Sequence, residues 1–241
     1  MRLAIISDVH GNWEAFQAVL EDIQTQNIDE TVSLGDLIDY GPDSELIVQE
    51  YRRRKITGVL GNHEQALFDP DLQENLVPAA YDSFQITRRQ LTPESIQWLQ
   101  TLPASLVIGK IRLVHGLPPD SRIDYIDYVP LHILRYVFQS YPEFICFVGH
   151  THRVAMYEYT PRDYVKITEL PEKHTLKPSS RYIINAGSVG QPRDPDRRAK
   201  YVIYDTTQNS LELRRIEYDA QKTAAKIRQL GYPEINARRL L

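Results

Sequence analysis

The sequence contains little cysteine, no long apolar run and no strong excess of charge of either sign. Its one cysteine among 241 residues, Cys146, excludes an internal disulfide framework and lies in an apolar run that predicts a buried thiol. No stretch approaches the roughly 20 apolar residues that a membrane helix needs, so a membrane protein is not expected. The net charge of -4 argues against a general binder of nucleic acids or anionic membranes, although it leaves room for local basic patches.

The lack of targeting and linker signals predicts a single cytoplasmic domain. The N-terminal segment MRLAIISD is too short for a signal peptide and has no cleavage site of small residues. No repeat, low-complexity tract or Gly/Ser linker divides the chain, and its 42% hydrophobic and 25% charged residues are typical of a globular domain with a core. We therefore expect one domain over residues 1–241, alone or as a homo-oligomer.

The first part of the chain alternates between strand and helix patterns. Apolar runs predict strands in RLAIIS, ETVSLGD and ITGVLGN. Between them, apolar residues at helical spacing predict helices in NWEAFQAVLEDIQTQ, with Asn12 as the cap, and in PDSELIVQEYRRRK, with Pro42 near the first turn. This alternation is typical of parallel βαβ units.

The rest of the chain mixes helices with further strands. Helical patterns at 79–91 and 93–101, with Thr92 as a cap, precede a hairpin in SLVIGKIRLVHG, a helix near 130–140 and a strand in FICFVGH. Strand patterns then dominate, in VAMYEYT, YVKITEL, RYIINAGS, KYVIYDT and SLELRRIEY, before a helix from Ala220 to Leu230 and a short tail. The mixture predicts an α/β fold in which two sheets pack face to face with helices outside.

Polar side chains follow five of the predicted strands. The segments SDVHG, LGDLIDYG, LGNHE, LVHG and VGHTH each end a strand with Asp, Asn or His, usually beside a glycine, and together they hold five of the seven histidines. Ligands of open α/β sheets gather beyond the carboxyl ends of the strands, and glycine lets the backbone approach a ligand closely. The other two histidines, His132 in a helix and His174 in a loop, are expected to be ordinary surface or packing residues.

Each segment alone has a purely structural explanation. Asp8 with His10 fits a helix-capping turn, Asp36 with Asp39 fits a solvated turn, and Asn62 or His115 fits a turn or core position. All five segments at one end of the sheets are better explained by a metal site. The candidate ligands are Asp8, His10, Asp36, Asn62, His115, His150 and His152.

The candidate donors are nitrogen and oxygen atoms only. Imidazole with carboxylate suits manganese, iron, zinc, nickel or cobalt better than calcium. Seven ligands exceed the need of one transition ion, whereas two ions about 3.5–4 Å apart, sharing Asp36, would use them all. Such a pair is suited to in-line displacement at phosphorus.

The series DVH, GDLID, GNHE, HG and GHTH resembles the motifs of the calcineurin-like metallophosphoesterase family. INAGSVGQPRD and the short chain are similar to its small bacterial phosphodiesterase branch. The resemblance implies a metallo-dependent phosphatase-like, four-layer α/β/β/α sandwich with two mixed β-sheets. It implies two divalent ions, Mn²⁺ first, with Fe, Ni, Zn, Co or Mg as alternatives. By this resemblance one ion is held by Asp8, His10, Asp36 and His152, and the other by Asp36, Asn62, His115 and His150.

The resemblance also implies catalytic roles for His63 and Asp39. His63 would donate a proton to the leaving oxygen, and Asp39 would orient His63. The chemistry agrees, because an alkoxide leaving group needs an acid near neutral pH and a carboxylate fixes the tautomer and raises the histidine pKa.

Two positions depart from the protein phosphatases of the family. Tyr40 and Leu60 stand where those enzymes carry arginines, which grip the terminal oxygens of a phosphomonoester. This difference favours a phosphodiester substrate. Arg193 and Asn185 are candidates for the rim of the substrate site, although the loop around Arg193 also fits a solvated turn. The tyrosines in YIDYVPLHILRYVFQSY fit core packing better than base stacking, with a lid as a further alternative.

The predicted function is therefore a metal-dependent phosphoesterase acting on a small phosphate ester. We expect a phosphodiesterase, with in-line attack by a hydroxide that bridges the two metals. Two alternatives stay open. One is a phosphoprotein or dinucleoside-polyphosphate phosphatase on the same centre. The other is a non-catalytic scaffold that resembles the retromer subunit of this fold, which loss of ligands would favour.

Overall fold

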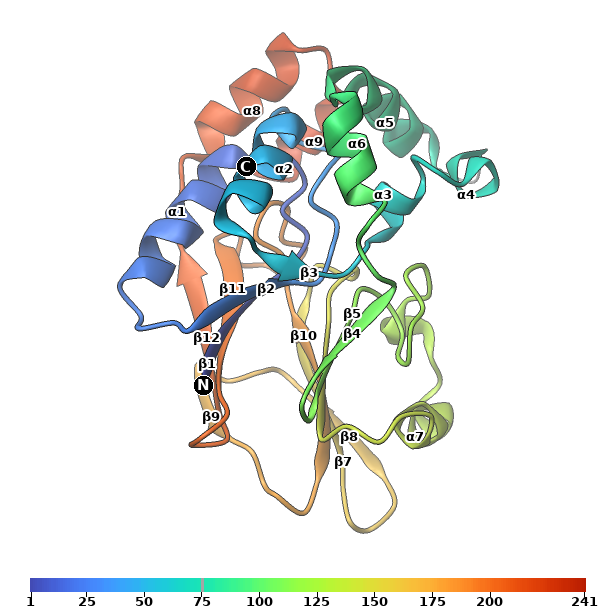
Figure 1. The fold of residues 1–241 in the computed structure, drawn as a ribbon, viewed down its shortest axis with the longest axis vertical. Helices are drawn as coiled ribbons and strands as arrows, with labels where there is room; N and C mark the ends of the chain where they lie inside the picture. Colours follow the sequence, from blue (N-terminus) through green and yellow to red (C-terminus); the bar gives the residue numbers. More distant parts are fainter. Residues whose placement is uncertain (75) are drawn as a thin grey trace.

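The computed structural model describes residues 1–74 and 76–241. Within this part of the chain the strands form two six-stranded mixed sheets that pack face to face (Figure 1). The first sheet has the order β3-β2-β1-β11-β12-β9, with strands β1 (Arg2–Ile6), β2 (Glu30–Ser33), β3 (Thr57–Gly58), β9 (Lys173–Thr175), β11 (Ala199–Asp205) and β12 (Ser210–Ile216). The second has the order β4-β5-β6-β10-β7-β8, with strands β4 (Ser105–Ile108), β5 (Ile111–Val114), β6 (Ile145–Val148), β7 (Val154–Tyr159), β8 (Val165–Thr168) and β10 (Arg181–Ala186).

Each sheet contains three adjacent parallel strands. β1 pairs in parallel with β2, and β2 with β3, while β5, β6 and β10 are parallel in the second sheet. Antiparallel strands complete both sheets, as where β11 pairs with β1 and β4 forms the predicted hairpin with β5. Parallel neighbours end at the same edge of a sheet, which brings the loops that follow them together.

The core lies between the two sheets and beneath the outer helices. Because side chains alternate along a strand, Leu3 and Ile5 of β1 face the second sheet, whereas Ala4 and Ile6 face the helices outside. Burial on both faces is typical of parallel strands and explains why RLAIIS reads as a continuous apolar run. Cys146 is buried in β6, as predicted.

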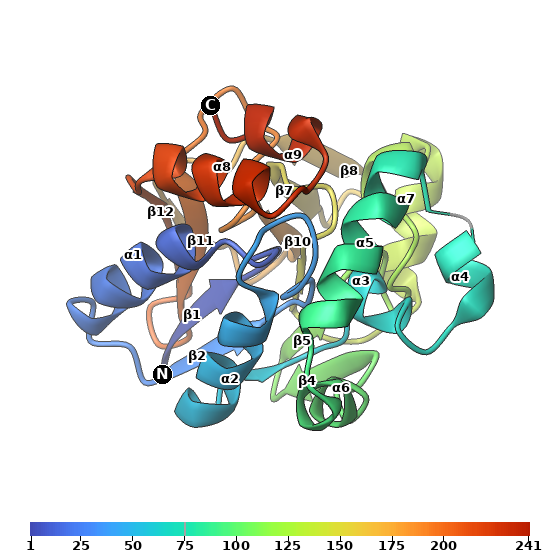
Figure 2. The same ribbon diagram turned by 90° about the horizontal axis from the view of Figure 1, so that it is seen from above.

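Helices cover the outer faces of both sheets. α1 (Trp13–Gln24) and α2 (Ser44–Arg54) pack on the first sheet, and α7 (Leu131–Gln139) packs on the second (Figure 2). This arrangement confirms the α/β/β/α order. The other helical segments are α3 (Asn62–Gln65), α4 (Pro70–Glu74), α5 (Pro78–Gln90), α6 (Pro93–Leu99), the 3-10 helix η1 (Ile126–Tyr128), α8 (Ala220–Gln229) and α9 (Glu234–Arg238). Among the described residues, none of the helices combines the length and the apolar character that crossing a bilayer requires.

Some helix ends were predicted correctly from local sequence features, and others were not. Asn12 caps α1 by accepting the N–H of Ala15 (3.1 Å), and Thr92 caps α6. Pro42 lies near the first turn of α2, directly before the cap Asp43, but the helix begins at Ser44, two residues later than the predicted segment. The predicted third strand is also shorter than its apolar run, with ladder pairing only at Thr57–Gly58.

Two segments were assigned incorrectly from the sequence. His174 lies in the edge strand β9, paired with Leu211, rather than in a loop. The tail after Leu230 forms a further helix, α9. Asn236 of α9 donates a hydrogen bond to the Tyr40 carbonyl (3.2 Å), so this tail reaches the loop after β2. β9 and α9 are both too short to show a periodic pattern in the sequence. Their secondary structure depends on tertiary contacts.

Candidate metal centre

The loops after β1, β2 and β6 carry strained backbone at the predicted ligands. Non-glycine residues rarely adopt positive φ, and each such residue costs on the order of 1–3 kcal/mol. Hydrogen bonds between the loops hold this geometry, as from Asp8 N to Gly35 O (3.1 Å). Clustered strain of this kind is typical of functional sites. The residues concerned are Asp8 (φ 52°), His10 (46°), Asp36 (52°), His150 (66°) and His152 (58°).

Glycine permits the close approach of these loops. A Cβ on Gly149 would overlap the side chains of Ser7 and Asp8, and a Cβ on Gly61 would overlap Asp36. The backbone N–H of His150 accordingly reaches the Asp8 carboxylate (3.2 Å), which ties the end of the second sheet to the end of the first. The glycines beside the motif residues therefore have the role that the sequence predicted for them.

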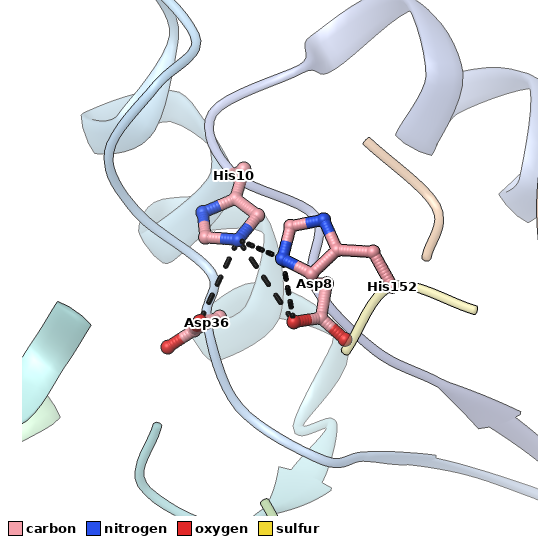
Figure 3. Close-up of side chains that lie close together, drawn as sticks. All are labelled: Asp8, His10, Asp36 and His152. Carbon is pink, nitrogen blue, oxygen red and sulfur yellow. Dashed lines mark hydrogen bonds and ion pairs between the residues drawn. The ribbon is translucent and has the colours of Figure 1, made fainter. Parts of the chain in front are cut away.

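Four side chains converge in a first group made of Asp8, His10, Asp36 and His152, whose potential ligand atoms lie within 4.8 Å of one another. Nε2 of His152 lies 3.3 Å from Asp8 Oδ1, and Nε2 of His10 lies 3.5 Å from Asp36 Oδ2. The two Nε2 atoms are 3.2 Å apart (Figure 3). All four residues are buried.

A second group lies next to the first and shares Asp36. It consists of Asp36, His115 and His150. Nε2 of His115 lies 3.1 Å from Asp36 Oδ2 and 3.2 Å from His150 Nδ1. Asn62 Oδ1 lies 3.1 Å from the same His115 nitrogen, which places the amide at the edge of this group. The structure thus brings all seven predicted ligands together, and the two histidines of GHTH belong to different groups.

A backbone carbonyl orients each of the four imidazoles. One ring nitrogen makes a hydrogen bond to the carbonyl, and the other points into the cluster, where its lone pair is available whenever the ring is neutral. These partners fix the tautomers that a metal requires. The pairs are His10 Nδ1 with Ile38 O (2.9 Å), His115 Nδ1 with Leu34 O (2.7 Å), His152 Nδ1 with Gln191 O (2.7 Å) and His150 Nε2 with Ile123 O (3.1 Å).

Burial keeps most of these histidines neutral. It lowers the pKa of His150 to about 3 and holds the pKa of His10 and His152 well below its usual range. His115 differs: burial lowers its pKa, but the Asp36 carboxylate outweighs burial and raises it to about 9. Burial also raises the pKa of Asp8 to about 7. At neutral pH a proton on His115 therefore supplies positive charge at the position where a cation would bind.

The donor set fits divalent transition ions. Asp8 and Asp36 are 0% and 1% exposed, and a buried carboxylate requires a compensating charge. Among the described residues, their ion pairs join them only to histidines. Neutral imidazole nitrogens and carboxylate oxygens, without thiolate, are the donors that such ions prefer.

His63 and Asp39 form a hydrogen-bonded pair beside the first group. His63 Nδ1 lies 2.7 Å from Asp39 Oδ2, and the His63 ring lies 4.9 Å from that of His10. Ser83 donates to the other Asp39 oxygen (2.5 Å). Burial lowers the pKa of His63, but the charge of Asp36 and the hydrogen bond with Asp39 outweigh it and raise the pKa to about 9. The pair has the geometry of an oriented general acid.

Glu64 is a residue of the site that the sequence analysis did not identify. Its buried carboxylate accepts the backbone N–H groups of Asp36 (2.9 Å), Leu37 (2.7 Å), Ile38 (3.1 Å) and Gly61 (2.9 Å). It therefore fixes the loop that presents the shared carboxylate. Its position directly after His63 in GNHE could have drawn attention to it. A carboxylate that is buried there and binds no metal needs hydrogen-bond donors.

The two predicted rim residues have different surroundings. Asn185 is fully buried, where it donates to Gly149 O (2.8 Å) and Thr151 Oγ1 (2.9 Å), so it supports the GHTH loop rather than lining a rim. Arg193 is half-buried beside the centre, and its N–H donates to His152 O (3.1 Å). His132 in α7 and His174 in β9 belong to neither group of ligands.

Comparisons with known proteins agree with this geometry. The model of the calcineurin-like phosphoesterase superfamily domain matches residues 1–209. The uncharacterized protein MJ0912 of Methanocaldococcus jannaschii is 30% identical over 248 residues, which cover 99% of this chain and 96% of that protein. The crystal structure of a metallophosphoesterase from Sphaerobacter thermophilus is 35% identical, with a TM-score of 0.86 and coverage of 100% and 98% of the two chains.

A second solved structure shares the fold at lower identity. The hypothetical protein PH1004 from Pyrococcus horikoshii OT3 has a TM-score of 0.79 at 17% identity, with 99% of this chain and 97% of that chain covered. The family model spans most of the sequence, including every motif at the strand ends. The chain therefore belongs to the calcineurin-like phosphoesterase superfamily and is a metallophosphoesterase, a hydrolase of phosphoric esters.

Proposed function

We propose that this chain hydrolyses phosphate esters at two divalent metal ions that share Asp36. The observation that supports the proposal most directly is the presence of Asp36 in both groups of converging ligand atoms. When bound, the two cations would neutralise the phosphate and lower the pKa of the attacking water. One ion would be held by Asp8, His10, Asp36 and His152, and the other by Asp36, Asn62, His115 and His150.

The residues around the ions have separate tasks. The backbone carbonyls hold the four imidazoles in the orientation that metal binding needs, and Glu64 holds the Asp36 loop in place. His63, oriented by Asp39, would protonate the leaving oxygen, because an alkoxide is a poor leaving group near neutral pH. Its raised pKa keeps the required proton on the imidazole at that pH.

The choice of ester follows from the surroundings of the centre. Tyr40 packs 4.6 Å from the His10 ring and 4.7 Å from the His63 ring, in the position after GDLID where related protein phosphatases carry an arginine. On this ground a phosphodiester is the first substrate class to test, and phosphomonoesters and dinucleoside polyphosphates are the second.

Metal analysis combined with two model substrates tests the proposal. The purified protein is stripped with a chelator, reloaded with Mn²⁺, Ni²⁺, Zn²⁺, Co²⁺, Fe²⁺ or Mg²⁺, and assayed with bis(p-nitrophenyl) phosphate and p-nitrophenyl phosphate. We expect two ions per chain and hydrolysis that depends on them. Inertness toward both esters and toward a dinucleoside polyphosphate, with two ions bound, would support the scaffold alternative. Uptake of a single ion would contradict the shared role of Asp36.

A further inference from the structure

Two arginines lie beside the metal centre in segments outside the ligand motifs. Arg193 is in the loop after β10, and Arg239 follows α9, beyond the residues that the family model matches. Gln191 connects Arg239 to the centre: its side chain accepts a hydrogen bond from Arg239 Nη1 (3.3 Å), and its carbonyl pairs with His152 Nδ1 (2.7 Å). The N–H of Arg193 donates to the carbonyl of the same histidine (3.1 Å).

Both guanidinium groups face two tyrosines that border the ligand groups. Tyr40 lies 4.6 Å from the His10 ring of the first group, and Tyr125 stacks at 3.8 Å on the His150 ring of the second. The charges of Arg193 and Arg239 both act on these two tyrosines. The arginines therefore stand at the mouth of the centre rather than on a remote surface.

Neither arginine forms a close ion pair within the described residues, although the charge of Arg193 acts on the Asp8 carboxylate at longer range. In the part of the chain that the structure describes, no ion pair joins Arg193 or Arg239 to a carboxylate, and Arg193 Nε is buried without a hydrogen-bond partner. Burial and the neighbouring charge of Arg193 lower the pKa of Arg239. Two half-buried like charges held together are unfavourable unless an anion joins them, because burial weakens solvent screening.

The C-terminal segment holds Arg239 in place. The Arg197 side chain donates to the carbonyls of Arg238 and Arg239, Asn236 donates to Tyr40 O, and Leu240 is buried. The charge is thus fixed by packing and hydrogen bonds before any ligand arrives. Preorganised charge of this kind costs little ordering entropy when it binds.

We propose that Arg193 and Arg239 bind unesterified oxygens of a substrate phosphate beside the metal centre. A guanidinium pairs with two phosphate oxygens at once, and a second one matches a group with two negative charges. Two guanidinium groups therefore reverse the preference inferred from Tyr40 alone: they favour phosphomonoesters or the terminal phosphate of a polyphosphate over singly charged diesters. Arg193 and Arg239 would take over the role of the two arginines that the protein phosphatases of the family carry at the positions of Tyr40 and Leu60. The substrate preference rests on the proposed function, whereas the binding of phosphate does not.

Binding of inorganic phosphate tests the anion site without catalysis. Isothermal titration of the metal-free and Zn²⁺-loaded protein compares wild type with Arg239→Gln and Arg193→Gln. We expect the phosphate dissociation constant to rise about 10- to 100-fold in each variant, as for the loss of a charged hydrogen bond. Arg238→Gln is the matched control, because that neighbouring side chain is 74% exposed and its binding should match wild type. Unchanged phosphate affinity in both variants, with the fold intact by circular dichroism, would overturn the proposal.

Kinetics with three substrates test the preference. Arg239→Gln should lower kcat/KM about 10-fold or more for p-nitrophenyl phosphate or ADP, and less than about threefold for bis(p-nitrophenyl) phosphate. A selective loss with p-nitrophenyl phosphate identifies a monoester, and one confined to ADP identifies a polyphosphate. Equal losses with all three overturn the preference. If wild type hydrolyses none of them yet needs Arg239 to bind phosphate, the phosphoesterase proposal fails and the anion site stands. Arg239→Lys keeps the charge without the paired donors and should recover part of the affinity.

Discussion

The carboxylate of Glu64 accepts the backbone N–H of Asp36 at 2.9 Å, although the two residues follow different strands. Each Glu64 oxygen takes two N–H groups of the surrounding loops. Glu64 belongs to neither ligand group. It therefore acts by fixing the loop that presents the Asp36 carboxylate, which both groups share.

Replacing Glu64 by glutamine should disturb this loop strongly. In either orientation the amide NH₂ faces two N–H donors, so about two hydrogen bonds to a charged acceptor are lost, at roughly 1.5–3 kcal/mol each. We expect a loss of stability on the order of 3 kcal/mol in urea unfolding of the metal-free protein. Glu217→Gln, with a side chain that is 87% exposed, is the control. A stability equal to that of wild type would show that the loop does not depend on Glu64.

Asp36→Asn should abolish the binding of two ions while the fold survives. Asparagine keeps the size of the side chain but loses the charge that both ligand groups share, and removal of a shared ligand affects both ions. We expect metal analysis to give fewer than two ions per chain and hydrolysis to fall by several orders of magnitude. Wild-type turnover in this variant would contradict the bridging assignment.

His63→Ala should slow the hydrolysis of esters with poor leaving groups more than that of esters with good ones. A general acid contributes about 10²- to 10⁴-fold where the leaving oxygen needs a proton, and little where it does not. Comparing aryl esters whose phenols differ in pKa measures this dependence, with His132→Ala, a change in α7 outside both ligand groups, as the control. Losses that are equal along the series would contradict the acid role of His63.

Acid should weaken the packing of the C-terminal helices through Glu14. Glu14 of α1 pairs with Lys226 (2.8 Å) and Lys222 (3.2 Å) of α8, and Thr223 donates to it (3.0 Å). Burial by itself raises the pKa of Glu14, but the hydrogen bonds from Lys226 and Thr223 outweigh it and lower the pKa below its usual 4.5. The unfolded chain then binds the proton more readily, so this contribution is present above pH 4.5 and is lost as the pH falls toward the folded pKa.

Urea unfolding between pH 3 and pH 7 measures this effect. The difference in stability between wild type and Glu14→Gln should shrink as the solution is acidified, since both side chains are then neutral. Asp43, which also pairs with Lys226, has a pKa raised by burial and contributes with the opposite sign, but it is common to both proteins. A difference that does not change with pH would exclude a contribution from Glu14 ionisation.

The architecture and the candidate ligand residues could be predicted from local features of the sequence. Continuous apolar runs such as RLAIIS mark strands buried on both faces, and polar residues directly after such runs must lie at a sheet edge. Those are local properties, so the strands, the caps at Asn12 and Thr92 and the candidate ligands could be predicted without coordinates.

Only the tertiary structure decided which ligands group together and what supports them. These features depend on contacts between residues far apart in the chain: the sharing of Asp36, the carbonyls that orient the imidazoles, the burial of Asn185 and the hydrogen bond from Arg239 to Gln191. The short elements β9 and α9 exist for the same reason, because pairing and packing partners stabilise them more than their own few residues do. A periodic pattern reports which face of a segment is buried, but it carries no information about which distant residue covers that face.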